Sequence, residues 1–191
     1  TMATRHVPFH SARPAIISRV VIVQLKNKSH IALYKSGYYL KSGKCLFPGN
    51  KTIAPGDRDR TIFAKKSYTA SGSVGAMIYE LDNDLSSRLV ILFSNPFSYL
   101  LHDRFFAMHI TRNRANAKQF YNGMYYHGGI LESYVRAQKD IIHTSFTLER
   151  DGIRVTGSMS QEPRSVLRVT VEDLQAQSKG TGAERDMAPK S

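Results

Sequence analysis

The sequence holds one cysteine, Cys45, so no disulfide bond can form within the chain. It also lacks the run of roughly 18 apolar residues that a membrane-spanning helix needs. The apolar stretches at residues 20–23 and 89–93 have only the length of strands. Residues 1–19 contain two prolines and three arginines and lack the apolar core of a secretory signal. These absences exclude an internally disulfide-linked scaffold and a helical membrane span.

Signatures of enzyme chemistry are equally scarce. The chain has no HExxH, GxSxG or P-loop pattern, and Cys45 with seven scattered histidines gives no spacing of metal ligands or of a nucleophile and its base. Residues 82–84 read Asp-Asn-Asp, but the glycine and the distant glutamate of a calcium loop are not in register, so a turn fits better. We therefore predict a protein that is not an enzyme, with no catalytic residues, no metal site and no cofactor.

Acidic residues are few relative to basic ones. The 15 Asp and Glu stand against 27 Lys and Arg, which gives a net charge of +12. Such a surface favours anionic partners, among them nucleic acid, acidic lipid and acidic glycan. The basic tracts, such as residues 65–66 and 112–114, are short and scattered, as on an ordinary solvated surface. Charge alone leaves the class of partner open.

Short runs of β-forming residues, bounded by turn residues, fill the chain from residue 18 to residue 173. They lie at residues 20–23, 31–34, 38–40, 61–65, 74–81, 88–94, 105–110, 144–149, 153–159 and 166–171. Lys35-Ser36-Gly37 indicates a tight turn between the second and third runs, and the composition of residues 48–60 indicates a surface loop. About ten strands at this spacing predict an all-β sandwich or barrel in one domain.

One segment departs from the β pattern. Residues 116–126 lack β-branched side chains and place Tyr121, Met124 and Tyr125 at the i, i+3, i+4 spacing of a helical face, so we predict a short helix. At the chain ends we expect a short N-terminal segment over 1–17 and a flexible tail over 174–191, since Met187 is the only large apolar residue after Leu174. The sandwich then occupies residues 18–173.

A loop rich in apolar side chains follows the sixth of these runs, residues 88–94. Pro96 ends the run after Ser94, because proline cannot donate to a strand ladder. If the loop is exposed, its large side chains indicate contact with lipid or protein. The alternative is that they fold back into the core. The candidate contact residues are Phe97, Tyr99, Leu100, Leu101, His102 and Phe105.

Tyrosines cluster in the predicted helix. Tyr121 and Tyr125 are four residues apart and share a face, with Tyr126 at its edge. Tyrosine rings attract a quaternary ammonium group through their negative faces, and their hydroxyls can donate to a neighbouring phosphate. Ordinary packing gives the same spacing, so the pattern leaves both interpretations open.

Several motifs together resemble the actinoporins, the pore-forming cytolysins of sea anemones, and their actinoporin-like relatives. They are Tyr-Leu-Lys-Ser-Gly at 39–43, Ser-Gly-Ser-Val-Gly at 71–75, Tyr-Glu-Leu at 79–81, Leu-Phe-Ser-Asn-Pro-Phe-Ser-Tyr at 92–99 and the YxxxYY pattern at 121–126. The resemblance covers residues 18–173. It implies an actinoporin-like β-sandwich of about ten strands with one or two short flanking helices. It also implies a phosphocholine pocket lined by Ser42, Val74, Ser94, Pro96, Tyr121, Tyr125 and Tyr126.

Two departures from the family pattern bear on activity. The family carries tryptophans in the loop after its Ser-x-Pro motif, whereas this chain has no Trp, which predicts weaker anchoring at the membrane interface. The family also forms its pore with a long amphipathic segment before the first strand. Here Pro8 and Pro14 interrupt that region.

From these patterns we expect a secreted or membrane-associated protein that recognises phosphocholine headgroups, above all sphingomyelin. Pore formation, with a homo-oligomer on the membrane, is what the resemblance implies. The alternative is a non-lytic lectin-like or protein-binding β-sandwich with a glycan as one candidate ligand, since a fold does not fix a function. Nucleic acid is less favoured, because the aromatic residues cluster instead of alternating with Lys and Arg.

Overall fold

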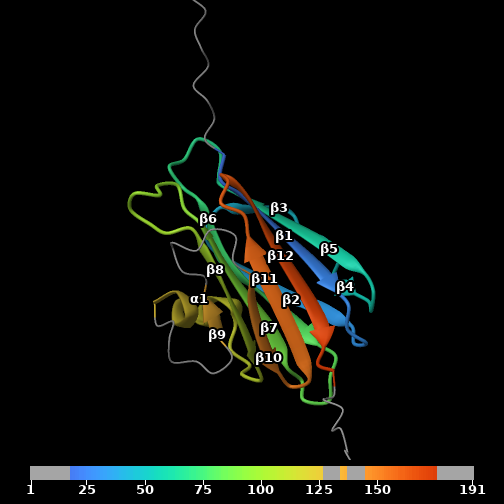
Figure 1. The fold of residues 1–191 in the computed structure, drawn as a ribbon. Helices are drawn as coiled ribbons and strands as arrows, with labels where there is room; N and C mark the ends of the chain where they lie inside the picture. Colours follow the sequence, from blue (N-terminus) through green and yellow to red (C-terminus); the bar gives the residue numbers. More distant parts are fainter. Residues whose placement is uncertain (1–17, 127–133, 137–144, 176–191) are drawn as a thin grey trace, which may run out of the picture.

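The computed structural model describes residues 18–126, 134–136 and 145–175. In these residues two six-stranded sheets stack face to face, and one helix lies on the outside of the second sheet (Figure 1). The predicted N-terminal segment over 1–17 and residues 176–191 of the predicted tail lie outside the described residues. No helix in the described ranges is long and apolar enough to cross a membrane.

The first sheet has the order β10-β11-β12-β1-β5-β3. Its strands are β1 (Val20–Asn27), β3 (Lys44–Phe47), β5 (Arg58–Ala64), β10 (Phe146–Arg150), β11 (Ile153–Met159) and β12 (Arg164–Asp173). β1 and β12, from the two ends of the sandwich domain, pair in parallel, and the other pairs are antiparallel. The apolar residues alternate along β1 and β12, so one face of the sheet is buried and the other faces outward.

The second sheet has the order β4-β2-β6-β7-β8-β9. Its strands are β2 (Leu33–Ser42), β4 (Thr52–Ile53), β6 (Ser73–Leu81), β7 (Arg88–Asn95), β8 (Phe105–Thr111) and β9 (Tyr134–Arg136). Nearly every residue of the central strands β6, β7 and β8 is buried. These strands are apolar on both faces because the first sheet covers one face and the helix covers part of the other.

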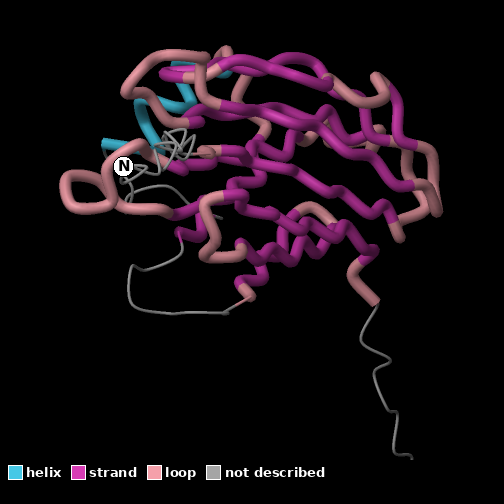
Figure 2. The backbone as a smooth tube through the Cα atoms, turned by 90° about the horizontal axis from the view of Figure 1, so that it is seen from above, coloured by secondary structure: helices cyan, strands magenta, loops and turns pink. Residues whose placement is uncertain are grey.

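The helix α1 (Ala117–Tyr126) packs on β2, β6 and β7, and Figure 2 shows it in cyan against the strands. A reciprocal pair of hydrogen bonds starts it. The Asn116 side-chain oxygen accepts from the backbone N–H of Gln119, and the Gln119 side-chain oxygen accepts from the backbone N–H of Asn116, both at 2.9 Å. Phe120, Tyr121 and Met124 then bury their side chains against the second sheet. The position of the tyrosines is thereby fixed relative to the strands.

The predicted all-β sandwich with a short helix is confirmed, with differences at several strands. The runs at 31–34 and 38–40 form one strand, β2, which pairs with β6 along its length and absorbs the expected turn as an irregularity between Lys35 and Gly37. The region 48–60, expected to be a loop, holds β4 and the first residues of β5. The strands β3 and β9 were not predicted.

Candidate functional site

A pocket of about 680 Å³ opens where α1, the end of β2, the start of β6 and the loop after β7 meet. Its volume lies within the range usual for small-molecule sites. Besides the residues of β2, β6 and α1, its lining includes the short segment 70–72 that leads into β6. The lining residues are Lys41, Ser42, Ala70, Ser71, Gly72, Val74, Pro96, Phe97, Ser98, Leu101, His102, Tyr121, Tyr125 and Tyr126.

Three tyrosine rings of α1 form one wall of this pocket. Tyr121 and Tyr125 stack with ring centroids 5.2 Å apart, and Tyr126 stands edge-on to Tyr125 at 4.9 Å. Tyr39 of β2 packs against Tyr121 at 5.3 Å, and Phe105 of β8 packs against Tyr125 at 5.5 Å. The two further rings support the wall from the sheet side and restrict the movement of the tyrosines that line the pocket.

The Tyr121 hydroxyl stays protonated over the physiological range. Burial raises its pKa above the ordinary value of 10.0, and the neighbouring phenols of Tyr125, Tyr126 and Tyr39 raise it further. A protonated phenol is a hydrogen-bond donor. This wall therefore combines aromatic faces with a hydroxyl that can donate to an anionic oxygen.

The remaining lining mixes polar and apolar side chains, and none of the described lining residues is acidic. The Ser42 hydroxyl donates to the Gly72 carbonyl at 3.1 Å, and Ser71 and Ser98 add further hydroxyls. Lys41 contributes an ammonium group. Because no Asp or Glu is among the described residues that line the pocket, a bound cationic group would rely on the tyrosine rings, while a bound anionic group would find donors among the hydroxyls and the ammonium group.

Two contacts hold the loop after β7 against the rest of the pocket. A Cβ on Gly72 would lie 2.4 Å from the carbonyl oxygen of Asn95, so only glycine permits this approach of the two backbones. The buried side chain of Arg19 donates to the carbonyl oxygens of Pro96 and Phe97, both at 2.8 Å, and its guanidinium lies 4.3 Å from the centre of the Tyr99 ring. Arg19 thus links the start of β1 to the loop.

The family model described as sea anemone cytotoxic protein matches residues 15–173. The chain belongs to this family. A search of the curated proteins finds no match. The matched range covers both sheets and α1, and so includes every element that lines the pocket.

Solved structures resemble the fold at low sequence identity. The lipid-binding protein Nakanori is 15% identical, with a TM-score of 0.63 over 80% of this chain and 70% of that chain. The lectin XCL of Xerocomus chrysenteron is 11% identical, with a TM-score of 0.46 over 81% of this chain and 98% of that one. IP-1A from Alcaligenes faecalis is 13% identical, with a TM-score of 0.44 over 81% and 91%. At these identities the likeness to Nakanori shows the fold alone.

The structure brings together most of the residues that the sequence placed in a headgroup site. Ser42, Val74, Pro96 and the three tyrosines of α1 all line the pocket. Ser94 does not, because its side chain is buried and donates to the Asp103 carbonyl at 3.0 Å. It braces the two ends of the loop instead.

The predicted contact loop is exposed only at its tip. Leu100 and Leu101 are 97% and 77% exposed, and His102 is exposed beside them. Phe97 and Tyr99 are partly buried beneath Arg19. The expectation of an exposed Phe105 was wrong: it belongs to β8, is 3% exposed and packs under Tyr125. The loop ends before it, and α1 covers its side chain.

Sequence reasoning did not select Lys41, Ser71 and Ser98 as pocket residues. Each lies next to or within a motif already noted, Lys41 beside Ser42 and Ser98 within the run after Pro96. A polar or cationic side chain one position from a predicted ligand was the available signal. It is a weak signal, because neighbouring residues of a regular strand point to opposite faces.

Proposed function

We propose that this protein binds phosphocholine headgroups at a membrane surface through the pocket beside α1. The observation that carries the proposal is the lining itself: a tyrosine wall, hydroxyls and an ammonium group, and no carboxylate in the part of the lining that the structure describes. Phosphocholine is zwitterionic, with a quaternary ammonium that suits aromatic faces and a phosphate that suits hydroxyl and ammonium donors. Membership in a family of cytotoxic proteins and the fold shared with a lipid-binding protein support this proposal.

Membrane contact on this proposal takes place in two stages. The net charge of +12 attracts the protein to membranes that carry anionic lipid. The pocket then captures a headgroup, while Leu100 and Leu101, next to its mouth, insert shallowly among the lipids. With no tryptophan in the chain, these leucines supply the apolar anchoring, and the residence time depends mainly on the headgroup contact.

Binding to liposomes tests the proposal. Vesicles of phosphatidylcholine, with and without sphingomyelin, are compared with phosphatidylglycerol vesicles, which keep the phosphate and lack choline. The salt concentration is high enough to screen long-range attraction. We expect binding to the choline vesicles to exceed binding to phosphatidylglycerol. Tyr125→Ala should lower affinity about tenfold, because a desolvated cation–π contact contributes about 1–2 kcal/mol.

Tyr34→Ala is the matched control. Tyr34 is an exposed tyrosine near the opposite end of β2, away from the pocket, so its removal should leave binding unchanged. Equal binding to vesicles with and without choline, or equal losses in the two variants, would refute the headgroup proposal. Dye release in the same assay distinguishes pore formation from binding alone, and a preference for the sphingomyelin vesicles identifies the lipid.

A further inference from the structure

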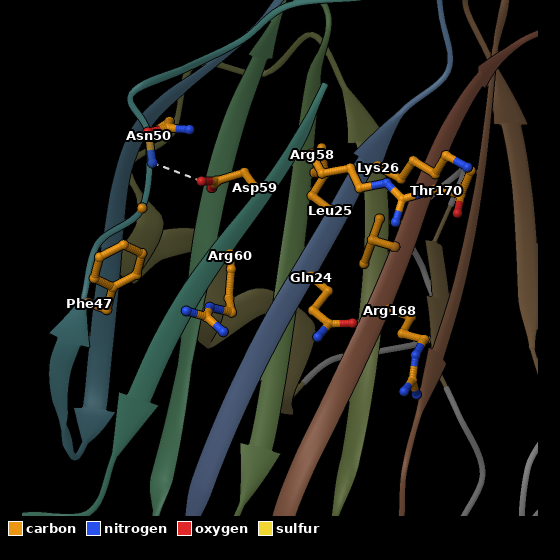
Figure 3. A pocket seen from close by; sticks show the side chains of 12 residues that line it. Gln24, Leu25, Lys26, Phe47, Asn50, Arg58, Asp59, Arg60, Arg168 and Thr170 are labelled. Atoms are coloured by element: carbon orange, nitrogen blue, oxygen red, sulfur yellow. Dashed lines mark hydrogen bonds between the residues drawn. The ribbon is translucent and has the colours of Figure 1, made fainter. Parts of the chain in front are cut away.

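A second concave surface lies on the outward face of the first sheet, across β5, β1 and β12. It has a volume of about 540 Å³, and Figure 3 shows its side chains spread over these neighbouring strands. Four of the lining residues are cationic: Lys26, Arg58, Arg60 and Arg168. We call this surface the basic groove. It shares no lining residue with the pocket beside α1.

Strand pairing arranges these residues in two rows. Gln24 of β1 lies between Arg60 of β5 and Arg168 of β12, and two residues further along Lys26 lies between Arg58 and Thr170. Neighbouring strands are about 4.8 Å apart and alternate residues of one strand about 6.8 Å apart. The four cations therefore sit on a patch only about 10 Å across, which raises the local density of positive charge.

The groove cations have no acidic partner among the described residues. Asp59 is the acidic residue among the described lining residues, but it is buried and its carboxylate accepts from the Lys35 ammonium group at 2.6 Å. It also accepts from the backbone N–H of Asn50 at 2.7 Å (Figure 3). Elsewhere on the surface, cations such as Arg112 and Arg154 form ion pairs. The described residues therefore do not offset the electrostatic repulsion among the four groove cations, and an anionic ligand would reduce it.

The two ends of the chain offer little to neutralise the groove. Residues 1–17 contain two arginines and no acidic residue, and residues 176–191 contain three basic and two acidic residues. A second copy carries the same net charge of +12 and is repelled at long range. Charge complementarity therefore points to a partner other than this chain.

The position of the groove argues against the same bilayer serving as the anionic ligand of both the groove and the pocket. Val20 lies at the end of β1 beside the loop that carries Leu100 and Leu101. Gln24 and Lys26 are four and six residues further along β1, at a distance of about 14–20 Å from Val20. They also face outward from the first sheet, whereas α1 and the pocket lie on the second sheet. A flat membrane in contact with Leu100 and Leu101 would leave the groove in water.

The uncharged lining indicates the kind of polyanion. Gln24, Asn50 and Thr170 supply two amides and a hydroxyl, which can bond the hydroxyls of a sugar. Phe47 is the only aromatic residue among the described lining residues, and the Arg60 guanidinium lies over its ring at 5.8 Å. Single-stranded nucleic acid is usually bound by several stacking rings, which the described lining lacks.

We propose that the basic groove binds a sulfated linear polysaccharide that crosses the strands of the first sheet. Its sulfate groups lie against Lys26, Arg58, Arg60 and Arg168, and its hydroxyls lie against Gln24, Asn50 and Thr170. This site is independent of the headgroup pocket. The protein would then hold a sulfated glycan on its side while its loop end remains free to meet a lipid surface.

The test compares the wild type with an Arg60→Gln, Arg168→Gln double variant on immobilised heparin under a salt gradient. Lys51→Gln with Lys66→Gln is the matched control, since both lysines are exposed, lie outside the groove and remove the same charge. We expect the groove variant to elute at clearly lower salt than the control. The slope of log affinity against log salt should fall by about two for the groove variant, as on loss of two sulfate contacts. Binding to choline vesicles should be unchanged.

Equal shifts in the two double variants would overturn the proposal, because they would show adsorption by overall charge. The proposal would also be overturned if desulfated heparin retained the wild type as strongly as heparin does. If a single-stranded oligonucleotide competed as effectively as free heparin at equal charge concentration, the groove would be a general polyanion site and the proposal would fail. Loss of phosphatidylserine-vesicle binding in the groove variant without loss of heparin binding would assign it to lipid.

Discussion

Replacing Arg19 with methionine should destabilise the protein and loosen the loop that completes the pocket. The Arg19 side chain is 8% exposed, has no acidic partner among the described residues and donates to two backbone carbonyls of the loop, those of Pro96 and Phe97. Its guanidinium also lies over the ring of Tyr99. Methionine keeps much of the side-chain length and the contact with the ring but donates no hydrogen bond.

The size of the effect follows from these contacts. Hydrogen bonds from a charged donor contribute about 1.5–3 kcal/mol each, so two of them give about 3–6 kcal/mol. Removing a buried guanidinium also removes its desolvation cost, which offsets part of this. We expect a net loss of about 3 kcal/mol for Arg19→Met. Arg19→Lys should lose about half as much, because an ammonium group keeps the charge but cannot reach both carbonyls with the geometry of the guanidinium fork.

Urea unfolding measures the change. With a slope of about 2 kcal/mol per molar urea, a loss of 3 kcal/mol lowers the midpoint by about 1.5 M. Affinity for choline vesicles should fall in the same variant, since Pro96 and Phe97 line the pocket. A midpoint shift below about 0.3 M for Arg19→Met would refute the argument that these hydrogen bonds hold the loop. A lysine variant as unstable as the methionine variant would refute the argument from geometry.

Three other substitutions test separate parts of the structure. The hydrogen bond from Arg112 holds the pKa of Asp151 below its ordinary value of 3.8, so the stability from this carboxylate is fully present above 3.8 and is lost as the pH falls through the lower pKa of the folded state. Asp151→Asn should therefore be less stable than wild type in urea at pH 7, and the difference should shrink as the pH is lowered below 3.8. Gly72→Ala should lower both the thermal midpoint and headgroup affinity, because the new Cβ meets the rigid backbone of the loop; an unchanged midpoint would contradict the close approach. Replacing Leu100 and Leu101 with serine should change stability by less than about 0.5 kcal/mol but reduce co-sedimentation with choline vesicles, and full binding would show that the loop tip does not insert.

The positions of most strands and of the helix along the chain could be predicted because their patterns are local. β1 and β12 alternate apolar and polar residues, and residues 121–125 have helical spacing, so each element depends mainly on its own sequence. The motifs of the family then indicated which of these residues meet at one end of the sandwich. Most of the pocket could be anticipated on this basis.

The errors lie where a distant partner decides the local conformation. The segment at Lys35 and Gly37 has the composition of a turn, but pairing with β6 keeps it extended as an irregular strand. Phe105 follows an exposed loop, yet α1, which comes later in the chain, covers it. The basic groove was missed for the same reason, since Lys26 and Arg168 become neighbours only through the parallel pairing of β1 with β12.

The parallel pairing of the first and last strands of the domain also decides where a label can be attached. β1 starts beside the loop at Pro96, while β12 ends beside His30, whose side chain meets Asp173 at 2.6 Å. The two positions are separated by the length of β1, about 27 Å. A fluorophore linked ahead of Ser18 would report the depth of the end that we propose meets lipid, whereas one linked after Asp173 would lie at the other end of the sandwich. The pair would measure how the molecule is oriented on a bilayer.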